Sequence, residues 1–443
     1  MSEQHEAGLA AVLGALEGAP EPARAGREVG SILEKALAGR EVGVEEGARL
    51  FEATGRELGP LFATADHLRR EAVGDTVTYV VNRNINFTNV CVKHCGFCAF
   101  SRAHLAQEGY FLPTSEVLRR AREAYELGAT EVCVQAGLAP GMEGWHLVNL
   151  CRELKEALPD LHIHGFSPEE VLYGAELSGV SVADYLRALQ EAGVGSLPGT
   201  SAEVLVQRVR DVISPGRITV AQWVELIQTA HRLGIPTTST MMYGHIETAH
   251  EKAEHLALLR RVQQETGGFT EFVPLGFIHA EAPMATRRSP PAGLRRGPTG
   301  IETLKMYAVS RIMLHGWIHN IQVSWVKEGM KLCQVGLMTG ANDLGGTLIN
   351  ESISTAAGAQ HGQLQPPAAL RALAREMGRL PAERDTRYGI LRTFADPALD
   401  PDDALNSVDP NGRFGSYHEL IREQSFRFKD YFQARAAVPL PKA

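Results

Sequence analysis

The stretch Cys91-Val92-Lys93-His94-Cys95-Gly96-Phe97-Cys98 follows a β-like run at Val77-Thr78-Tyr79-Val80-Val81. The cysteines have the spacing C-x3-C-x2-C, and no fourth cysteine lies near them in the sequence. A cubane [4Fe–4S] cluster needs four ligands, which are usually thiolates. Three close thiolates therefore predict a cluster held by Cys91, Cys95 and Cys98, with one iron open to a ligand that is not a protein side chain.

A zinc site is the alternative interpretation of this stretch, with His94 or a distant histidine as the fourth ligand. Zinc sites usually arrive as two paired half-motifs, whereas this chain has a single group of clustered cysteines. His94 also lies inside that group, where the loop would have to fold awkwardly for it to bind. The remaining cysteines, Cys133, Cys151 and Cys333, are scattered, and we expect them to be small buried residues.

The composition is that of an ordinary globular protein, with 443 residues, 44% hydrophobic and 22% charged. The net charge of −8 argues against a broad nucleic-acid-binding surface. The acidic start, Met1-Ser2-Glu3-Gln4-His5-Glu6, lacks the features of a signal peptide, and no run of about 18 apolar residues predicts a membrane span. Clustered thiolate ligands fit a reducing compartment, so we expect a cytoplasmic protein with no membrane partner.

Short apolar runs alternate with amphipathic segments from Thr76 onward. The predicted strands cover residues 77–81, 131–135, 161–166, 194–197, 237–243, 272–278, 320–325 and, more weakly, 343–348. Eight strand–helix alternations predict an α/β fold of the (β/α)8 TIM-barrel type. A doubly wound open sheet is the alternative, disfavoured because no glycine-rich dinucleotide fingerprint follows the first strand. Barrel chemistry collects at the carboxyl ends of the strands, and the cysteine loop occupies that position after strand one.

The rest of the chain divides around this barrel. Residues 1–72 have alanine, glutamate, arginine and leucine at helical intervals, which predicts an N-terminal helical cap. The barrel is expected to span residues 73–380. Residues 381–443 are more polar and form a predicted C-terminal extension with no assigned role.

With the loop and the barrel placed, the stretch from Val77 to Cys91 resembles the cluster loop of one subgroup of radical S-adenosylmethionine (radical SAM) enzymes. That subgroup contains the tyrosine-utilising subunit of FO synthase and two menaquinone-pathway enzymes, aminofutalosine synthase and cyclic dehypoxanthinyl futalosine synthase. Residues 239–247, 267–275 and 340–347 are most similar to the FO synthase branch. The resemblance covers roughly residues 45–380.

The resemblance implies a [4Fe–4S] cluster and SAM as cofactors, with the SAM amine and carboxylate on the open iron. It implies transfer of the 4-hydroxybenzyl group of L-tyrosine to 5-amino-6-(D-ribitylamino)uracil, on the way to the deazaflavin FO. The other products would be 2-iminoacetate, methionine and 5′-deoxyadenosine. The implied partners are an external electron donor and the ring-closing subunit of FO synthase. A menaquinone-pathway reaction in the same barrel is the alternative.

Four residues are candidates for binding the cofactor. Phe97 lies between two ligands, where it could shield the cluster and pack on the SAM adenine, or simply pack within the loop. Gln135 and Gly137 end strand two, where the superfamily places a loop that binds the SAM amine, although Ala136 replaces one of the two glycines usual in the subgroup. Glu203 could accept hydrogen bonds from the SAM amine or ribose, or be the capping-box partner of Thr200 at a helix start.

Four more residues are candidates for catalysis. His162 and His164 alternate on strand three, so both could face the barrel lumen and polarise a substrate, or be satisfied core histidines. Tyr243 and His245 lie at the end of strand five, and the same two interpretations apply to them: contact with a substrate, or a structural role in the core.

Two residues are candidates for binding substrate. Asn342 and Asp343 precede a glycine pair at strand eight. They could hold the uracil edge or the ammonium of tyrosine. A turn-forming role is the alternative for this Asn-Asp pair.

Overall fold

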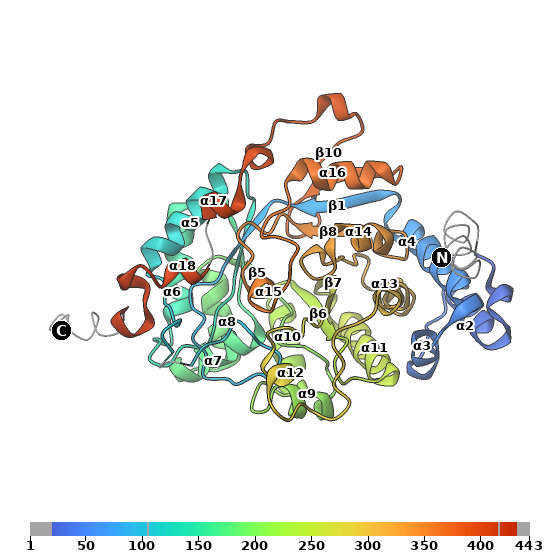
Figure 1. Cartoon of the computed structure of the whole chain (residues 1–443), viewed down its shortest axis with the longest axis horizontal. Helices are drawn as coiled ribbons and strands as arrows, with labels where there is room; N and C mark the ends of the chain where they lie inside the picture. Colours follow the sequence, from blue (N-terminus) through green and yellow to red (C-terminus); the bar gives the residue numbers. More distant parts are fainter. Residues whose placement is uncertain (1–19, 104–105, 415–416, 432–443) are drawn as a thin grey trace.

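Eight parallel strand positions form a closed ring in the computed structural model, which describes residues 20–103, 106–414 and 417–431 (Figure 1). The ring runs through β1 (Thr76–Val80) with β2 (Asn82–Ile85), then β3 (Glu131–Val134), β4 (His162–His164), β5 (Val194–Ser196), β6 (Thr237–Tyr243), β7 (Phe269–Gly276), residues 321–322 and β8 (Asp343–Gly346). Because β8 pairs in parallel with β1, the sheet closes on itself. The predicted (β/α)8 barrel is confirmed, and the open sheet is excluded.

The first and seventh strands differ from the prediction in extent. The first is divided at Val81, so that β1 pairs with β8 while β2 pairs with β3. The seventh, predicted over residues 320–325, is reduced to bridges from Ile321 to Phe272 and from Gln322 to Asp343. One reason is local, because the side chain of Asn342 accepts a hydrogen bond from the Ile321 backbone at 2.9 Å.

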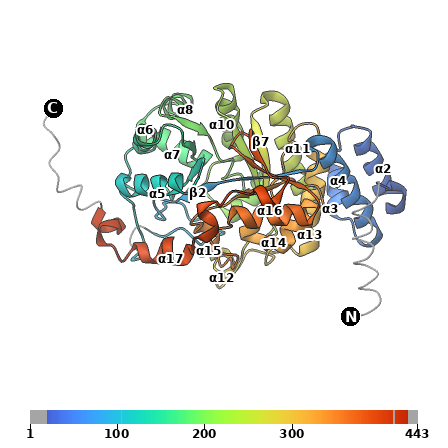
Figure 2. The ribbon, with the colours of Figure 1, turned by 90° about the horizontal axis from the view of Figure 1, so that it is seen from above.

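Helices cover the outside of the ring (Figure 2). Several begin at readable signals: α11 begins after Thr248, which forms a capping box with Glu251, and ends at Gly267 in the left-handed conformation. The helices of the barrel region are α5 (Thr114–Glu126), α6 (His146–Ala157), α7 (Pro168–Ser178), α8 (Val182–Glu191), α9 (Gln207–Ile213), α10 (Val220–Arg232), α11 (Ala249–Thr266), α12 (Pro283–Thr286), α13 (Gly300–Leu314), α14 (Trp325–Leu337), α15 (Ile353–Ala356) and α16 (Pro367–Glu376).

The N-terminal helices pack against the outer helices at one side of the barrel (Figures 1 and 2). They are η1 (Pro22–Ala25), α2 (Arg27–Leu37), α3 (Val44–Phe51), η2 (Gly55–Glu57) and α4 (Leu58–Val73). Helix α4 packs on α13, and α3 packs on α11 and α13. Being covered on both sides explains why α13 is apolar around most of its circumference. Residues 1–19 of the predicted helical region lie outside the described residues.

The C-terminal region begins as part of the barrel's own sheet. Strand β9 (Leu380–Arg384) pairs in parallel with β1, and β10 (Ile390–Thr393) pairs with β9 in the antiparallel direction. The predicted boundary after residue 380 therefore falls inside a strand. Arg384 extends from this hairpin into the barrel interior and donates to both carboxylate oxygens of Asp343, at 2.6 and 3.0 Å.

The last described segments run beside α5, opposite the N-terminal helices (Figures 1 and 2). They are α17 (Pro410–Phe414), α18 (Tyr417–Leu420) and η5 (Gln424–Phe426), whereas the preceding η3 (Pro397–Leu399) and η4 (Ala404–Ser407) lie beside α16. Phe111 donates its backbone N–H to the carbonyl of Phe426 at 2.8 Å, which ties this segment to the long loop after β2. Residues 432–443 of the predicted extension lie outside the described residues. Across the described ranges, no helix has the length and apolar character needed to cross a bilayer.

Candidate functional site

A cavity of about 250 Å³ lies at the carboxyl ends of the barrel strands, and all three cysteines of the loop line it. Phe97, Gln135, Gly137 and Glu203 line the same cavity, although they come from three separate loops. The closed ring explains this convergence, because loops that follow parallel strands all emerge at one end of a barrel. The structure thus brings together the predicted cluster ligands and all four predicted cofactor-binding residues.

The cysteine loop is held in place by backbone hydrogen bonds to its neighbours. Cys91 donates its N–H to Arg102 at 3.1 Å, and Gly96 donates to Ile213 at 2.8 Å. Cys95 is buried, while Cys91 and Cys98 are half-buried and His94 is exposed.

Burial raises the pKa of Cys95 to about 12 and also raises the pKa of Cys91. Thiolates at these positions therefore need nearby positive charge, which iron would supply. Among the described residues, no three His, Cys, Asp or Glu side chains converge on a site for one metal ion. A [4Fe–4S] cluster would meet that need, because it would place one iron at each of the three thiolates.

The end of strand β3 lies directly against the cysteine loop. Gly137 donates its N–H to the carbonyl of Thr88 at 2.9 Å. A Cβ added at Gly137 would lie only 2.3 Å from the carbonyl oxygen of Val90, the residue before Cys91. This close approach requires glycine at position 137.

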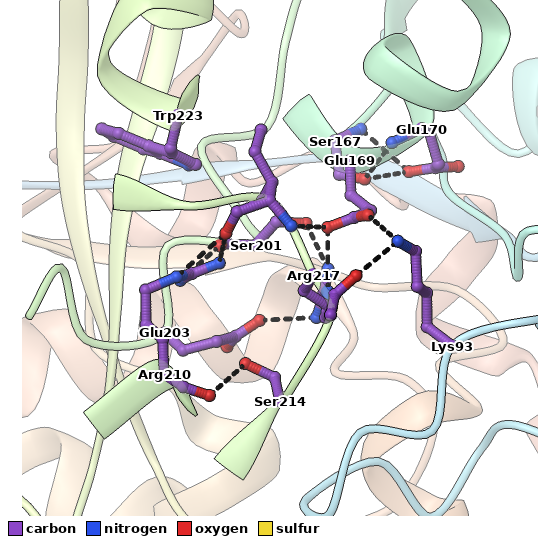
Figure 3. Close-up of polar contacts among 12 residues, drawn as sticks. Lys93, Ser167, Glu169, Glu170, Ser201, Glu203, Arg210, Ser214, Arg217 and Trp223 are labelled. Atoms are coloured by element: carbon purple, nitrogen blue, oxygen red, sulfur yellow. Dashed lines mark hydrogen bonds and ion pairs between the residues drawn. The ribbon is translucent and has the colours of Figure 1, made fainter. Parts of the chain in front are cut away.

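The carboxylate of Glu170 fixes the same strand end from the other side. It accepts hydrogen bonds from the N–H of Ala136 at 2.8 Å and from the N–H of Ser167 at 2.9 Å. Burial raises the pKa of Glu170 to about 7, although these donors and the Ser167 hydroxyl favour the charged form. Figure 3 shows Glu170 and Ser167 together at the start of α7.

Arg217 is at the centre of an ion-pair network on the same wall (Figure 3). Its guanidinium donates to Glu203 at 3.0 Å, to Glu169 at 3.2 Å and to the Ser201 hydroxyl at 2.6 Å. Lys93, from the cysteine loop, lies 3.3 Å from the other Glu169 oxygen. The guanidinium also lies 5.9 Å from the centre of the Phe97 ring. The network connects the cluster loop to the loops after β4 and β5.

The capping-box interpretation of Glu203 is wrong. No helix begins after Thr200: α9 starts only at Gln207, and Ser201 and Glu203 have φ values of +61° and +45°. Such left-handed residues cannot continue an α-helix, and they are uncommon among residues other than glycine. The hydroxyl of Thr200 accepts a hydrogen bond from Gln135 at 2.8 Å instead.

The opposite wall of the cavity is mostly apolar. Met242 comes from the end of β6, and residues 275–278 come from the end of β7. Ile353 and Ala357 come from the segment after β8. Lys327, the third residue of α14, is the charged side chain on this wall.

His162 and His164 do not line the cavity. Both face Ser196, whose hydroxyl lies 2.8 Å from Nε2 of His162 and 2.7 Å from Nδ1 of His164. Burial lowers the pKa of both histidines, to about 4 for His162, against the opposing charge of Glu131. They are satisfied histidines of the barrel interior.

Tyr243 and His245 are also away from the cavity. The hydroxyl of Tyr243 lies 3.2 Å from Thr303 and from Glu328, among the outer helices. His245 is fully buried: Nδ1 accepts the N–H of Ile246 at 2.8 Å, and Nε2 lies 2.9 Å from the carbonyl of Met242. Both ring nitrogens are used locally, which leaves none for a substrate.

Asn342 and Asp343 serve the barrel wall rather than the cavity. The side-chain oxygen of Asn342 accepts from Arg311 at 2.9 Å, and the carboxylate of Asp343 is paired with Arg384. The turn-forming alternative is supported at Asp343, whose Oδ1 also accepts the backbone N–H of Gly345 at 2.7 Å. Nothing in this arrangement leaves either side chain available to a substrate in the cavity.

The charged residues of the cavity that sequence reasoning missed are Lys93, Glu169, Glu170, Arg217 and Lys327. One signal was available, because Ser167-Pro168-Glu169-Glu170 is a capping box at the end of a predicted strand. Arg217 comes from the loop between α9 and α10. This loop does not follow a strand, so its position in the sequence gave no reason to expect it at the cavity.

Comparison with protein families gives two matches that together span most of the barrel. Residues 85–259 match the radical SAM superfamily, and residues 266–396 match the CofH/MqnC C-terminal region.

Curated relatives match along most of their length. A 5-amino-6-(D-ribitylamino)uracil–L-tyrosine 4-hydroxyphenyl transferase of Methanothermobacter thermautotrophicus is 49% identical over 81% of this chain and 96% of its own. A protein of the same name from Methanocaldococcus jannaschii is 48% identical over 80% of this chain and 98% of its own. FO synthase of Nocardia farcinica is 49% identical over 77% of this chain but only 39% of its own length.

Solved structures share the fold at low sequence identity. The FeFe-hydrogenase maturase HydG from Carboxydothermus hydrogenoformans matches with a TM-score of 0.61 and 15% identity, over 81% of this chain and 80% of its own. Methylornithine synthase (PylB) matches with a TM-score of 0.59 and 18% identity, over 79% of this chain and 97% of its own. These likenesses support the barrel alone.

Proposed function

This chain belongs to the radical SAM enzymes of the CofH/MqnC family, and we propose that it is a 5-amino-6-(D-ribitylamino)uracil–L-tyrosine 4-hydroxyphenyl transferase. The observation that carries the proposal is identity of 48–49% to transferases of that name over 96–98% of their length. The reaction joins the 4-hydroxybenzyl group of tyrosine to the ribitylated uracil and leaves the other two carbons as 2-iminoacetate.

Cys91, Cys95 and Cys98 would hold the [4Fe–4S] cluster, and SAM would occupy the cavity beside them. When bound and reduced, the cluster would supply the electron for reductive cleavage of SAM to methionine and a 5′-deoxyadenosyl radical. The role of the protein is to orient the cofactor and to keep water away from it. One buried and two half-buried cysteines on a cavity with an apolar far wall support that role.

The residues for SAM would come from the polar wall. The strand end Gln135–Gly137 offers backbone groups to the SAM amine, at a position fixed by Glu170 and Val90. Arg217 is suited to the SAM carboxylate, because a guanidinium has donors to spare beyond its two carboxylate partners. Glu203, held by Arg217, would face the amine or the ribose, and Phe97 would pack on the adenine.

The electron donor, a ring-closing partner and a cytoplasmic location belong to the same proposal. A transferase that stops at the uracil adduct needs a second enzyme to close the deazaflavin ring. All six cysteines are free thiols, which supports a reducing compartment.

An anaerobic product assay tests the proposal against the menaquinone-pathway alternative, which the joint CofH/MqnC family leaves open. Reconstituted enzyme, SAM and a reductant would be incubated either with tyrosine and the ribitylated uracil or with dehypoxanthinyl futalosine. We expect a hydroxybenzyl–uracil adduct in the first mixture and unchanged substrate in the second. Consumption of the futalosine derivative with no adduct in the first mixture would overturn the proposal.

A further inference from the structure

Three cationic side chains line the cavity, and two of them are already neutralised. Arg217 is paired with Glu169 and Glu203, and Lys93 is paired with Glu169 and hydrogen-bonded to the carbonyl of Gly216 at 2.6 Å. Lys327 differs from both, because its ammonium makes no hydrogen bond or ion pair with any described residue.

The described residues around Lys327 favour a positive charge on its ammonium but form no ion pair or hydrogen bond with it. Burial lowers the pKa of Lys327, and the carboxylate of Glu351 is the strongest influence in the opposite direction. Glu351 is buried and accepts the N–H of Ser354 at 2.8 Å, but its second oxygen has no partner within the described residues. Lys327 is half-buried on the cavity wall, so its ammonium is partly desolvated without a hydrogen-bond partner in the part of the chain that the structure describes, and a bound anion would offset that cost.

The groups around Lys327 are those that an aromatic amino acid would need. The wall from which it projects carries Met242, Leu275, Phe277 and Ile353, so an apolar ring can lie beside the ammonium. The ribitylated uracil carries hydroxyl and amino groups but no carboxylate. The two carboxylates that enter this site are therefore those of tyrosine and SAM.

The position of Lys327 favours tyrosine. Arg217 and the strand end Gln135–Gly137 lie on the wall built from the loops after β3, β4 and β5, whereas Lys327 lies in the first turn of α14, after the seventh strand. We propose that Lys327 is the residue that binds the α-carboxylate of tyrosine and orients its Cα–Cβ bond toward the SAM side of the cavity. This inference rests on the proposed function.

Binding of tyrosine and of tyramine, which lacks the carboxylate, tests the inference. Equilibrium dialysis would use the cluster-containing enzyme with SAM and no reductant, so that no turnover occurs. A charge-assisted hydrogen bond predicts that the unaltered enzyme binds tyrosine at least about tenfold more tightly than tyramine. Lys327→Met should bring that ratio close to one, because it removes the charge and keeps the length of the side chain.

Two further variants serve as controls. Lys327→Arg keeps a cation and should retain most of the preference for tyrosine. Lys331→Met makes the same change at an exposed position of the same helix and should leave the ratio unaltered. SAM affinity, measured in parallel, should be the same in all four proteins.

The outcomes distinguish binding of the tyrosine carboxylate from binding of the SAM carboxylate, and failure of this inference from failure of the proposed function. An unchanged ratio of the affinities for tyrosine and tyramine in Lys327→Met would overturn the inference. If SAM binding were weakened at the same time, Lys327 would be assigned to SAM. If the unaltered enzyme bound no tyrosine, the proposed function itself would fail. Loss of the preference in Lys327→Met alone would establish the assignment.

Discussion

Replacement of Gly137 by alanine tests the contact between the strand end and the cluster loop. The new Cβ would lie 2.3 Å from the oxygen and 2.8 Å from the carbon of the Val90 carbonyl. Ordinary contact begins at 3.4 Å, so the two backbones must separate by about 1 Å. Neither can yield cheaply, because Gly137 also donates its N–H to Thr88 at 2.9 Å.

The expected cost follows from these two contacts. Overpacking of this kind costs about 1–3 kcal/mol, and the strained hydrogen bond adds about 1 kcal/mol. We therefore expect Gly137→Ala to lower the free energy of unfolding by roughly 2–4 kcal/mol. Because Val90 precedes Cys91, the shift also moves the cluster loop, and a misplacement of about 1 Å can reduce a rate by about 100-fold.

The assay combines urea unfolding with iron content and the rate of 5′-deoxyadenosine formation under anaerobic conditions. Gly300→Ala is the matched control, since the same Cβ there meets no atom within 4 Å and the residue begins helix α13. We expect that control to change stability by less than about 0.5 kcal/mol. A Gly137→Ala protein with unaltered stability and SAM cleavage would refute the reasoning.

Three further predictions concern side chains on the polar wall. Cys95→Ala should abolish SAM cleavage and leave the barrel folded, as measured by product formation and circular dichroism. Arg217→Lys should weaken SAM binding by about tenfold in calorimetry, because it loses the guanidinium fork and keeps one charge. Glu170→Gln should alter the pH dependence of stability: a pKa of about 7 in place of 4.5 means that the native protein binds the extra proton, so its stability falls as pH rises between those values. The unaltered protein should lose roughly 3 kcal/mol relative to Glu170→Gln from about pH 5 to about pH 8.

Each of these has an outcome that contradicts it. SAM cleavage retained by Cys95→Ala would remove that residue from the ligand set. SAM affinity unchanged in Arg217→Lys would separate the guanidinium from the cofactor. Parallel stability curves for the Glu170→Gln and unaltered proteins would mean that burial does not raise the pKa of this carboxyl.

The barrel could be predicted from sequence because its signals are local. Short apolar runs located most strands to within a few residues, as at β3, β5 and β6. The cofactor-binding candidates could be predicted from the barrel topology, since Gln135 and Glu203 each follow a strand whose end faces the cysteine loop.

The failures arise where a side chain's direction depends on distant contacts. His162 and His164 do lie on one side of their strand, but the serine of the next strand engages both. The carboxylate of Asp343 is paired with Arg384, which lies on a hairpin some 40 residues later in the sequence. No periodicity marks such a partner, and the same holds for the carboxylates that neutralise Arg217.

The central claim is that this barrel moves the hydroxybenzyl part of tyrosine to a ribitylated uracil. Tyrosine labelled with ¹³C throughout its ring, supplied with SAM, reductant and the unlabelled uracil, tests it most directly by mass spectrometry. The whole ring label should appear in the uracil adduct and none in the 2-iminoacetate fraction. Label that stays in intact tyrosine while SAM is cleaved, or that reaches no uracil product, would contradict the claim.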